Sequence, residues 1–536
     1  MLPRRPEARL AATLGIVKQV LQRALLLHWP VRERSALIGA ALALFGSFLL
    51  NATWGMVILP IQRAFELGVD GEVLLRQLPD VVGLLAIAVV GALCTGISAF
   101  RIAVAATACM LAGSIMMTFA PSLLWVVAGM SLVSIGRSMV GVIAFAVVGD
   151  LIADKGRRTT SFATLGAVTP AAYIISPVIA GALIDMGGWR WVGAVWICGG
   201  LVLAFAAWWF RNLPSSTERT GRPEPWTPIL AGVALVALVQ AIGAIALHGV
   251  LSSWALLWVG ATVAAAGAWF GLVRVLPNPS LDGTTLRIQG LVPLLVVSMV
   301  AQCGDLWFYV GAVARFVHGL TPLQISLVLL VAQFAALGGA CLAGWLTRRI
   351  GLRATGTLLI GLFATSMFVS CVQSTVLPLA VTVAILSVSA VAEIGAGVCL
   401  SEAIMACAPK GLDRQVSSYR SAASGVGNAL ALLLIASTVS NVMAASMREH
   451  AEAAKPAHPE KIESLVKAVK DNAPIATIGR QLGLSPDRME ELRVARREVI
   501  VDGFRAHGLL SGVVLSIAAV GFWFVRRDAA PPSAAA

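Results

Sequence analysis

Apolar runs of about 20 residues recur along almost the whole chain, and no other feature constrains its fold as strongly. A run of that length, coiled as an α-helix, crosses the hydrocarbon core of a bilayer. By this criterion we count roughly fourteen runs between residues 35 and 526. Hydrophobic residues make up 58% of the chain and charged residues 12%, which excludes a soluble globular protein. The sequence therefore predicts an all-α polytopic membrane protein.

The runs fall into groups of six, two and six. We predict a cytoplasmic amphipathic segment at 1–34, a six-helix bundle at 35–212, a linker with two extra helices at 213–277, the first five helices of a second bundle at 278–447, an extracytoplasmic helical insert at 448–502, the last membrane helix at 503–526, and a tail at 527–536. Two six-helix halves related by an internal repeat are typical of transporters with a site near mid-membrane.

Basic residues gather in alternate short loops, and this asymmetry predicts the orientation. One side holds Lys155, Arg157 and Arg158, then Arg348, Arg349 and Arg353, then Lys410, Arg414 and Arg420. Segment 61–80, on the other side, is balanced by acids. The positive-inside rule then places both termini in the cytoplasm, here of a bacterial inner membrane. Because the membrane topology accounts for the net charge of +13, we expect no nucleic-acid partner.

Two carboxylates lie near the middle of apolar runs, Asp305 and Glu393. An acid at that depth is costly unless it is paired, hydrated or protonated, so it indicates a functional site. Ser298, Gln302, Asp305 and Tyr309 recur at helical spacing and predict one polar stripe on a helix. The stripe is expected to face a wet interior, where Asp305 and Glu393 bind protons or substrate. The alternatives are a structural acid paired to Arg315 or to backbone, and close helix packing around Glu393.

Arg137 places a permanent positive charge at mid-membrane. It is expected either to pair across the pore with Asp305 or Glu393, or to meet an anionic substrate. The alternative is a structural arginine bonded to carbonyl groups.

Enzymatic chemistry has no support in the sequence. There is no nucleophile–base pair in a plausible setting, no glycine-rich phosphate loop ending in Gly-Lys-Ser/Thr, and no spacing of metal ligands. We therefore expect no enzyme activity, no metal and no cofactor, with a proton gradient as the energy source. All eight cysteines lie in or beside apolar runs, so disulfides are not expected.

Several motifs occur in order along the chain. They are Leu50-Asn51-Ala52-Thr53-Trp54 through Pro60, Arg137 to Gly141, a Gly/Pro-rich stretch from Gly166 to Gly181 with Pro170 and Pro177, and Gly344 to Arg353. In this order and at these helix positions they resemble the motifs of the fourteen-helix drug:proton antiporters of the major facilitator superfamily, the EmrB/QacA type. The resemblance covers about residues 36 to 526. It implies two six-helix bundles plus two central helices, working by alternating access.

The resemblance also implies roles for particular residues. Arg137 would help to move the proton by biasing a nearby acid. A second group would serve the conformational change: Gly141, Gly166, Pro170, Pro177, Gly181, Gly344, Arg348 and Arg349. The chain departs from the family where the first-helix aspartate is Asn51, which cannot titrate, and where the second-half loop aspartate is Thr347. Asn51, Trp54, Gln302 and Tyr309 are expected to line the cavity, although core packing is the alternative for any one aromatic residue.

The leading hypothesis is a proton-coupled exporter of drugs or other bulky amphipathic small molecules, which works by alternating access and is in contact with membrane lipid. Two alternatives remain open. The cargo is an anionic or lipid-like amphiphile bound through Arg137, or the chain is the inner-membrane component of an efflux assembly. In the second case 448–502 docks a periplasmic adaptor protein rather than capping or gating the last helices.

Overall fold

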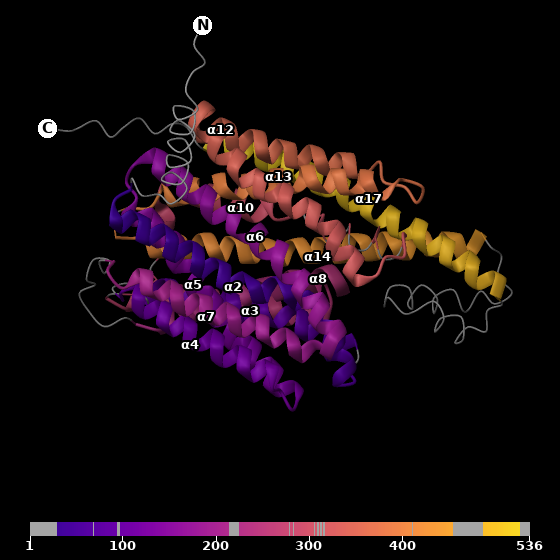
Figure 1. Cartoon of the computed structure of the whole chain (residues 1–536), viewed down its shortest axis with the longest axis horizontal. Coiled ribbons are helices and arrows are strands. Elements are labelled where there is room, and N and C mark those ends of the chain that lie inside the picture. Colours follow the sequence, from indigo (N-terminus) through magenta and orange to yellow (C-terminus); the bar gives the residue numbers. More distant parts are fainter. Residues whose placement is uncertain are drawn as a thin grey trace, which may run out of the picture.

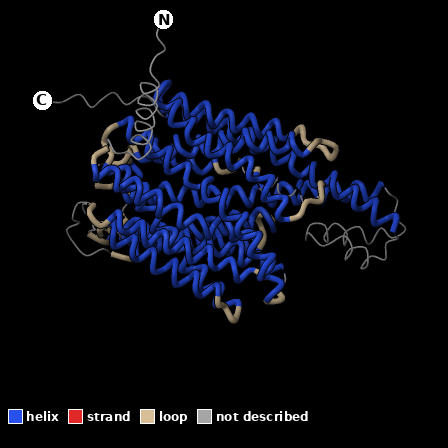
Figure 2. The backbone as a smooth tube through the Cα atoms, in the orientation of Figure 1, coloured by secondary structure: helices blue, strands red, loops and turns tan. Residues whose placement is uncertain are grey.

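A computed structural model describes most of the chain. The described residues are 29–67, 69–93, 97–213, 224–277, 279–281, 283–304, 306, 307, 310, 313, 314, 317–409, 411–453 and 486–525. Every regular element among them is helical, as Figure 2 shows. The predicted all-α fold is thereby confirmed.

The helices run side by side as a bundle (Figure 1). The N-terminal half consists of α2 (Val31–Ala64), α3 (Val69–Leu93), α4 (Ala99–Thr118), α5 (Leu123–Leu151), α6 (Lys155–Gly187) and α7 (Gly193–Phe210). A central pair follows, α8 (Trp226–His248) and α9 (Ser253–Val275). The C-terminal half contains α10 (Leu291–Ala301), α12 (Pro322–Ser370), α13 (Leu379–Met405), α14 (Asp413–Ala453) and α17 (Pro486–Val525). Two short 3₁₀ turns, Trp189–Val192 and Thr284–Arg287, precede α7 and α10.

Local sequence signals set several helix boundaries. Ser98 and Asp154 accept hydrogen bonds from backbone N–H groups in the first turns of α4 and α6. Thr321 and Gln324 form a capping box at the start of α12, with Pro322 in its first turn. Gly351 has a φ of 83° and turns the chain inside α12, so that this element is two helices joined at a kink.

Eleven helices among the described residues are long and apolar enough to cross a membrane, and one of these is the kinked α12. Two shorter apolar helices are Val81–Leu93 and Leu291–Ala301. The predicted total of fourteen spans stays a prediction. Segment 61–80 is not a long loop, because α2 continues to Ala64 and α3 begins at Val69.

The predicted continuous run 289–316 is wrong at its centre. The helix α10 ends at Ala301, and the backbone N–H groups of Gln302 and Cys303 instead bond three residues back, to Met299 and Val300, in turns. Gly304 lies so close to Phe363 and Leu515 that a side chain there would clash with both. The Ser511 hydroxyl donates to the freed carbonyl of Cys303 at 2.8 Å. A helix break in a membrane is tolerated when a neighbouring side chain satisfies the freed backbone in this way.

Each half is held by helix packing of its own. In the N-terminal half α2 packs against α5, α6 and α7, and α4 packs against α5 and α7. Gly46 of α2 and Gly199 of α7 each lie against the other's carbonyl oxygen, with no room for a side chain. In the C-terminal half α12 packs against α13 and α17, and α14 against α10 and α17. Small residues allow this close approach of membrane helices.

The two halves meet along what we call the seam. On one side of the seam α6 packs against α12 and α13, and on the other α14 packs against α3 and α5. The helix α8 covers the second contact, because Leu84, Val239, Val426 and Ala429 form one apolar cluster from α3, α8 and α14. We call the end of the bundle at which α2 begins and α17 ends the termini end.

At the opposite end, α14 and α17 extend beyond the other helices (Figure 1). The predicted helix start at Pro486 coincides with the first residue of α17. This helix continues through residues 502 and 503 to Val525, so the insert and the last span are not separate helices there. Residues 454–485 of the insert lie outside the described residues. So do most of the predicted N-terminal segment 1–34 and all of the tail 527–536.

Candidate functional site

Arg137 lies in a polar cluster at the centre of the N-terminal half. It is carried by α5, and its guanidinium donates a hydrogen bond to the side-chain oxygen of Asn51 on α2. The Asn51 side-chain nitrogen donates to the hydroxyl of Tyr173 on α6 at 2.8 Å. All three side chains are half-buried. Two sequence motifs that are 86 residues apart therefore form one site.

This cluster keeps a fixed charge. An amide cannot bind or release a proton near neutral pH, and an arginine stays protonated. Within the described residues the ion pairs do not include Arg137. The predicted pairing of Arg137 across the pore is not seen there, and the position that holds a carboxylate in the antiporters satisfies it through an uncharged oxygen.

Glu393 lies near the middle of α13 in the C-terminal half and is half-buried. The indole N–H of Trp307 donates to its carboxylate oxygen at 3.0 Å. Trp307 follows the break after α10, so the interrupted helix positions the donor. A discontinuous membrane helix beside a polar group is a common place for a transporter site.

Two of the predicted site residues cannot be placed. Asp305 and Tyr309 lie outside the described residues, so their roles stay predictions. Gln302 is half-buried at the end of α10, and its side chain lies against Gly427 of α14. Because the helix stops there, Ser298 and Gln302 do not continue into the regular polar stripe that the spacing predicts.

The break after α10 also adjoins a histidine that the sequence analysis does not single out. His507 of α17 is 1% exposed, and a ring nitrogen lies 3.4 Å from the Ser511 hydroxyl, which in turn bonds the Cys303 carbonyl. A single histidine in an apolar run gives no signal in the sequence, because its spacing matches no motif.

Trp54 is packed into the N-terminal half rather than left open. It is 6% exposed, its indole N–H donates to the Leu75 carbonyl at 3.2 Å, and its ring lies 6.4 Å from that of Trp196. Its predicted place in the cavity wall stays a prediction, whereas core packing describes its contacts.

The glycines of the conformational motifs lie along the seam. Gly166 of α6 lies directly against Val398 of α13, and Gly344 of α12 lies against Ala163 of α6. A side chain at Gly181 would lie within 4 Å of Met56 of α2 and Leu323 of α12. Gly141 of α5 lies beside Ser421 of α14. Pro170 and Pro177 both fall inside α6, whose length is uninterrupted. Their role in a conformational change stays a prediction that these contacts favour.

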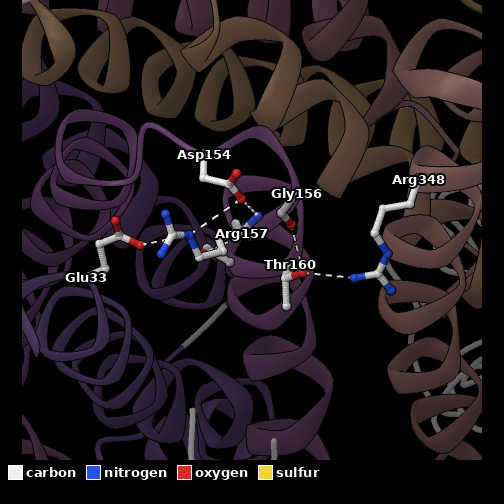
Figure 3. A network of polar contacts seen from close by, with 7 residues as sticks. Glu33, Asp154, Gly156, Arg157, Thr160 and Arg348 are labelled. Atoms are coloured by element: carbon white, nitrogen blue, oxygen red, sulfur yellow. Dashed lines mark hydrogen bonds and ion pairs between the residues drawn. The ribbon is translucent and has the colours of Figure 1, made fainter. Parts of the chain in front are cut away.

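Polar contacts join the halves at the termini end (Figure 3). Arg348 of α12 donates to the Thr160 hydroxyl of α6 at 2.9 Å. The neighbouring Thr159 donates to the Glu402 carboxylate of α13 at 2.7 Å. Within the N-terminal half, Arg157 lies 3.3 Å from Glu33 of α2. The start of α6 is therefore fixed to two helices of the other half, whereas Arg349 stacks over Trp345 instead.

Two residues of the seam are not recognised by the sequence analysis. Glu402, near the end of an apolar run, is not singled out there, but it is 4% exposed and bonded across the seam. Arg420 is counted among loop residues, but it lies inside α14 with its guanidinium over the Phe145 ring. Both residues contact side chains of the opposite half, and no local sequence pattern reveals such contacts.

The part of the chain that the structure describes contains no cluster of metal ligands. No group of three or more His, Cys, Asp or Glu side chains there is arranged to hold an ion.

The fold and these sites define a membrane transporter built from two helical halves around a polar seam. The sequence profile of the Major Facilitator Superfamily matches residues 36–432, and the chain belongs to that family. It is therefore a major facilitator transporter and an integral membrane protein.

Individual relatives are distant. The methyl viologen resistance protein SmvA of Salmonella typhimurium is 23% identical over 423 residues, covering 77% of this chain and 81% of the relative. The MFS-type transporter TOXA of Cochliobolus carbonum is 29% identical over 135 residues, or 24% of each protein.

Solved structures share the fold. The human organic anion transporter MFSD10 superposes with a TM-score of 0.56 at 13% identity, covering 92% of this chain and 100% of the other. The proton:xylose symporter XylE gives a TM-score of 0.55 at 12% identity, covering 92% and 95%. At such identities the likeness concerns the fold alone.

Proposed function

We propose that this transporter exports bulky amphipathic compounds in exchange for protons, and that Glu393 is a proton-binding group. The observation that carries the proposal is the half-buried carboxylate near the middle of α13, held by the Trp307 indole beside a broken helix. A carboxylate inside a membrane helix that can be protonated in one state and hydrated in another couples proton entry to movement.

The N-terminal half supports this assignment by exclusion. The Asn51 amide occupies the position at which the fourteen-helix antiporters carry an acid, and it bonds Arg137. The central cluster of that half therefore contains no carboxylate, and coupling would rest on the C-terminal half. Asp305, outside the described residues, remains a second proposed proton site there.

The kind of cargo is supported by a relative. SmvA is named for resistance to methyl viologen, an organic compound, and it aligns with most of this chain. We extend export of such compounds to this protein, with the fourteen-helix drug:proton antiporters as its proposed subgroup.

Orientation follows from the charges at the termini end. Arg157, Arg348 and Arg414 all lie at that end of the bundle. By the positive-inside rule this end would face the cytoplasm, which puts both termini there and the protein in the bacterial inner membrane. The contacts of Thr159 and Thr160 would then close the passage on the cytoplasmic side. Docking of a periplasmic adaptor through 448–502 stays a prediction.

Transport in proteoliposomes tests the proposal. Vesicles with an acidic lumen receive ethidium or methyl viologen outside, and accumulation is followed as protons leave. We expect accumulation with the unchanged protein and at least a tenfold loss in Glu393→Gln, since the amide cannot carry the proton. Exchange of labelled for unlabelled compound without a gradient should persist, because it needs no net proton movement.

A matched control makes the same change, carboxylate to amide, at an exposed position. Asp185 lies exposed near the end of α6, so Asp185→Asn should accumulate the compound normally. Full gradient-driven accumulation in Glu393→Gln would remove Glu393 from the mechanism.

A further inference from the structure

Arg420 is a cation placed inside the membrane-spanning part of the seam. It lies seven residues after the start of α14, about 10 Å along the helix axis. Its Nε atom is buried and has no hydrogen-bond partner. A buried guanidinium with an unused donor is costly, so its retention at this depth calls for a function.

The contacts of Arg420 come from both halves and contain no carboxylate. Its guanidinium lies 3.5 Å from the centre of the Phe145 ring of α5. Its two terminal nitrogens donate to the hydroxyls of Ser401 of α13 and Ser421 of α14, at 3.4 and 3.2 Å. Among the described residues its charge is not met by an ion pair.

The Phe145 ring stands where an anion would fit. The face of an aromatic ring carries partial negative charge, and a guanidinium packs against it for that reason. Phe145 also stacks on Phe162 of α6, at 6.1 Å between ring centres, and therefore belongs to the N-terminal half. A separation of the halves at the termini end would take Arg420 away from this ring and free its donors.

A second cation extends the same surface. Arg137, Gly141 and Phe145 follow each other at spacings of four residues, so they share one face of α5. Gly141 lies beside Ser421 of α14, which places this face on the seam. Arg137 is about 12 Å along α5 from Phe145. This face of the seam therefore carries two arginines whose hydrogen-bond partners among the described residues are uncharged.

We propose that Arg420 binds the anionic head of amphipathic organic anions, carboxylates or sulfonates, once the halves have separated. Its guanidinium and the hydroxyls of Ser401 and Ser421 supply the donors, and Phe145 competes for the cation in the closed state. This inference rests on the proposed export function and specifies one class of cargo for the same passage.

Equilibrium binding to the purified full-length protein in detergent tests the inference. The probe is carboxyfluorescein, a fluorescent organic anion, followed by anisotropy, with ethidium as the cationic comparison. Four variants are measured: Arg420→Gln, Arg420→Lys, Phe145→Leu and Arg211→Gln. Arg211 is the matched control, because it is an exposed arginine stacked on Trp208 away from the seam.

We expect Arg420→Gln to weaken carboxyfluorescein binding at least tenfold and to leave ethidium binding unchanged. Arg420→Lys should restore part of the affinity, because the charge is kept and the fork of donors is lost. Phe145→Leu should strengthen anion binding a few-fold, because the competing ring is gone. Arg211→Gln should bind as the unchanged protein does.

Three results would overturn the inference. One is no carboxyfluorescein binding by the unchanged protein, the second is equal binding by a folded Arg420→Gln, and the third is weaker binding by Phe145→Leu. If Arg420→Gln does not fold, Phe145→Leu still decides, because a purely structural Arg420 gives no reason for tighter anion binding.

Two further arms separate related outcomes. Displacement of the probe by short-chain phosphatidylglycerol shows that the site also accepts a lipid headgroup, and no displacement restricts it to free anions; the arginine site stands in both cases. Binding is measured without a gradient, so a failure of proton coupling in Glu393→Gln leaves this result unaffected. Loss of anion binding likewise leaves ethidium transport as a separate test of export.

Discussion

The two halves hold their central charges differently. In the N-terminal half, Arg137, Asn51 and Tyr173 join three continuous helices, and none of the three changes charge near neutral pH. In the C-terminal half, Glu393 bonds a tryptophan that follows an interrupted helix, and buried His507 lies behind the break. Under the proposed function, the fixed charge of Arg137 and the proton-binding carboxylate Glu393 belong to separate bundles, so a relative movement of the bundles would change the distance between them.

The largest expected effect concerns the fixed charge. Asn51→Leu removes the acceptor of the Arg137 guanidinium and should lower stability by about 2–3 kcal/mol, because a charged donor loses its partner. Thermal unfolding in detergent measures this. Asn51→Asp is the control, since it keeps an acceptor and should unfold close to the unchanged protein. Equal melting temperatures of Asn51→Leu and the unchanged protein would mean that Arg137 does not depend on the cluster. The contrast between the two halves in how they hold their central charges would then fail.

A smaller effect is expected at the helix break of the other half. Ser511→Ala removes the hydroxyl that bonds the Cys303 carbonyl and should cost about 1 kcal/mol. Ser516 of the same helix bonds its own backbone at Gly512, so Ser516→Ala is a matched control with almost no effect. Thermal unfolding compares the two. If both variants melt at the same temperature, the Cys303 carbonyl does not depend on the Ser511 hydroxyl.

The donor to Glu393 gives a third test. Trp307→Phe keeps an aromatic ring and removes only the N–H, so gradient-driven transport should fall about two- to four-fold, equivalent to less than 1 kcal/mol. Initial rates in proteoliposomes measure the change. Trp254 of α9 is 58% exposed, and Trp254→Phe should transport normally. An unchanged rate in Trp307→Phe would separate the tryptophan from the coupling site.

The smallest effect lies beyond the membrane spans. Burial, and second the positive charge of Arg497, lower the pKa of His318 from its ordinary value of 6.5. The folded protein then binds this proton less well than the unfolded chain. Stability from the neutral imidazole is therefore full above pH 6.5 and is lost as the pH falls through the lowered pKa.

Arg497→Gln removes the smaller of the two causes and should slightly reduce the loss of melting temperature on acidification. The measurement is a melting series from pH 7.5 to about pH 5, a range that spans the ordinary histidine value. In a His318→Gln background the same substitution should change nothing on acidification. A difference that persists there would assign the effect to another group.

The sequence predicts those parts of the molecule that depend on local pattern. Apolar run length identifies the spanning helices, and glycines such as Gly166 and Gly344 lie at the seam because close helix approach requires small residues. The break after Ala301 is not predictable in this way, because the run stays apolar across it. It depends on Phe363 and Leu515 from other helices.

The candidate site shows the same limit. Arg137 and Glu393 stand out because an ionisable group is rare in an apolar run. Asn51 is noticeable only against the family pattern, and its bond to Arg137 requires the fold. Arg420 and Glu402 lie near helix ends in the sequence and resemble loop residues. Their importance comes from Phe145 and Thr159, which belong to the other bundle.

The helix α8 has a mechanical consequence. It touches α3 and α14 through aliphatic side chains, such as Leu85 against Gly232 and Leu433 against Gly243. Lipid tails solvate such side chains about as well as a neighbouring helix does, so separating them within a bilayer carries little hydrophobic penalty. The extra hairpin can therefore lie across the junction of the two bundles without holding them together. It can move with either bundle while lipid fills the space that opens.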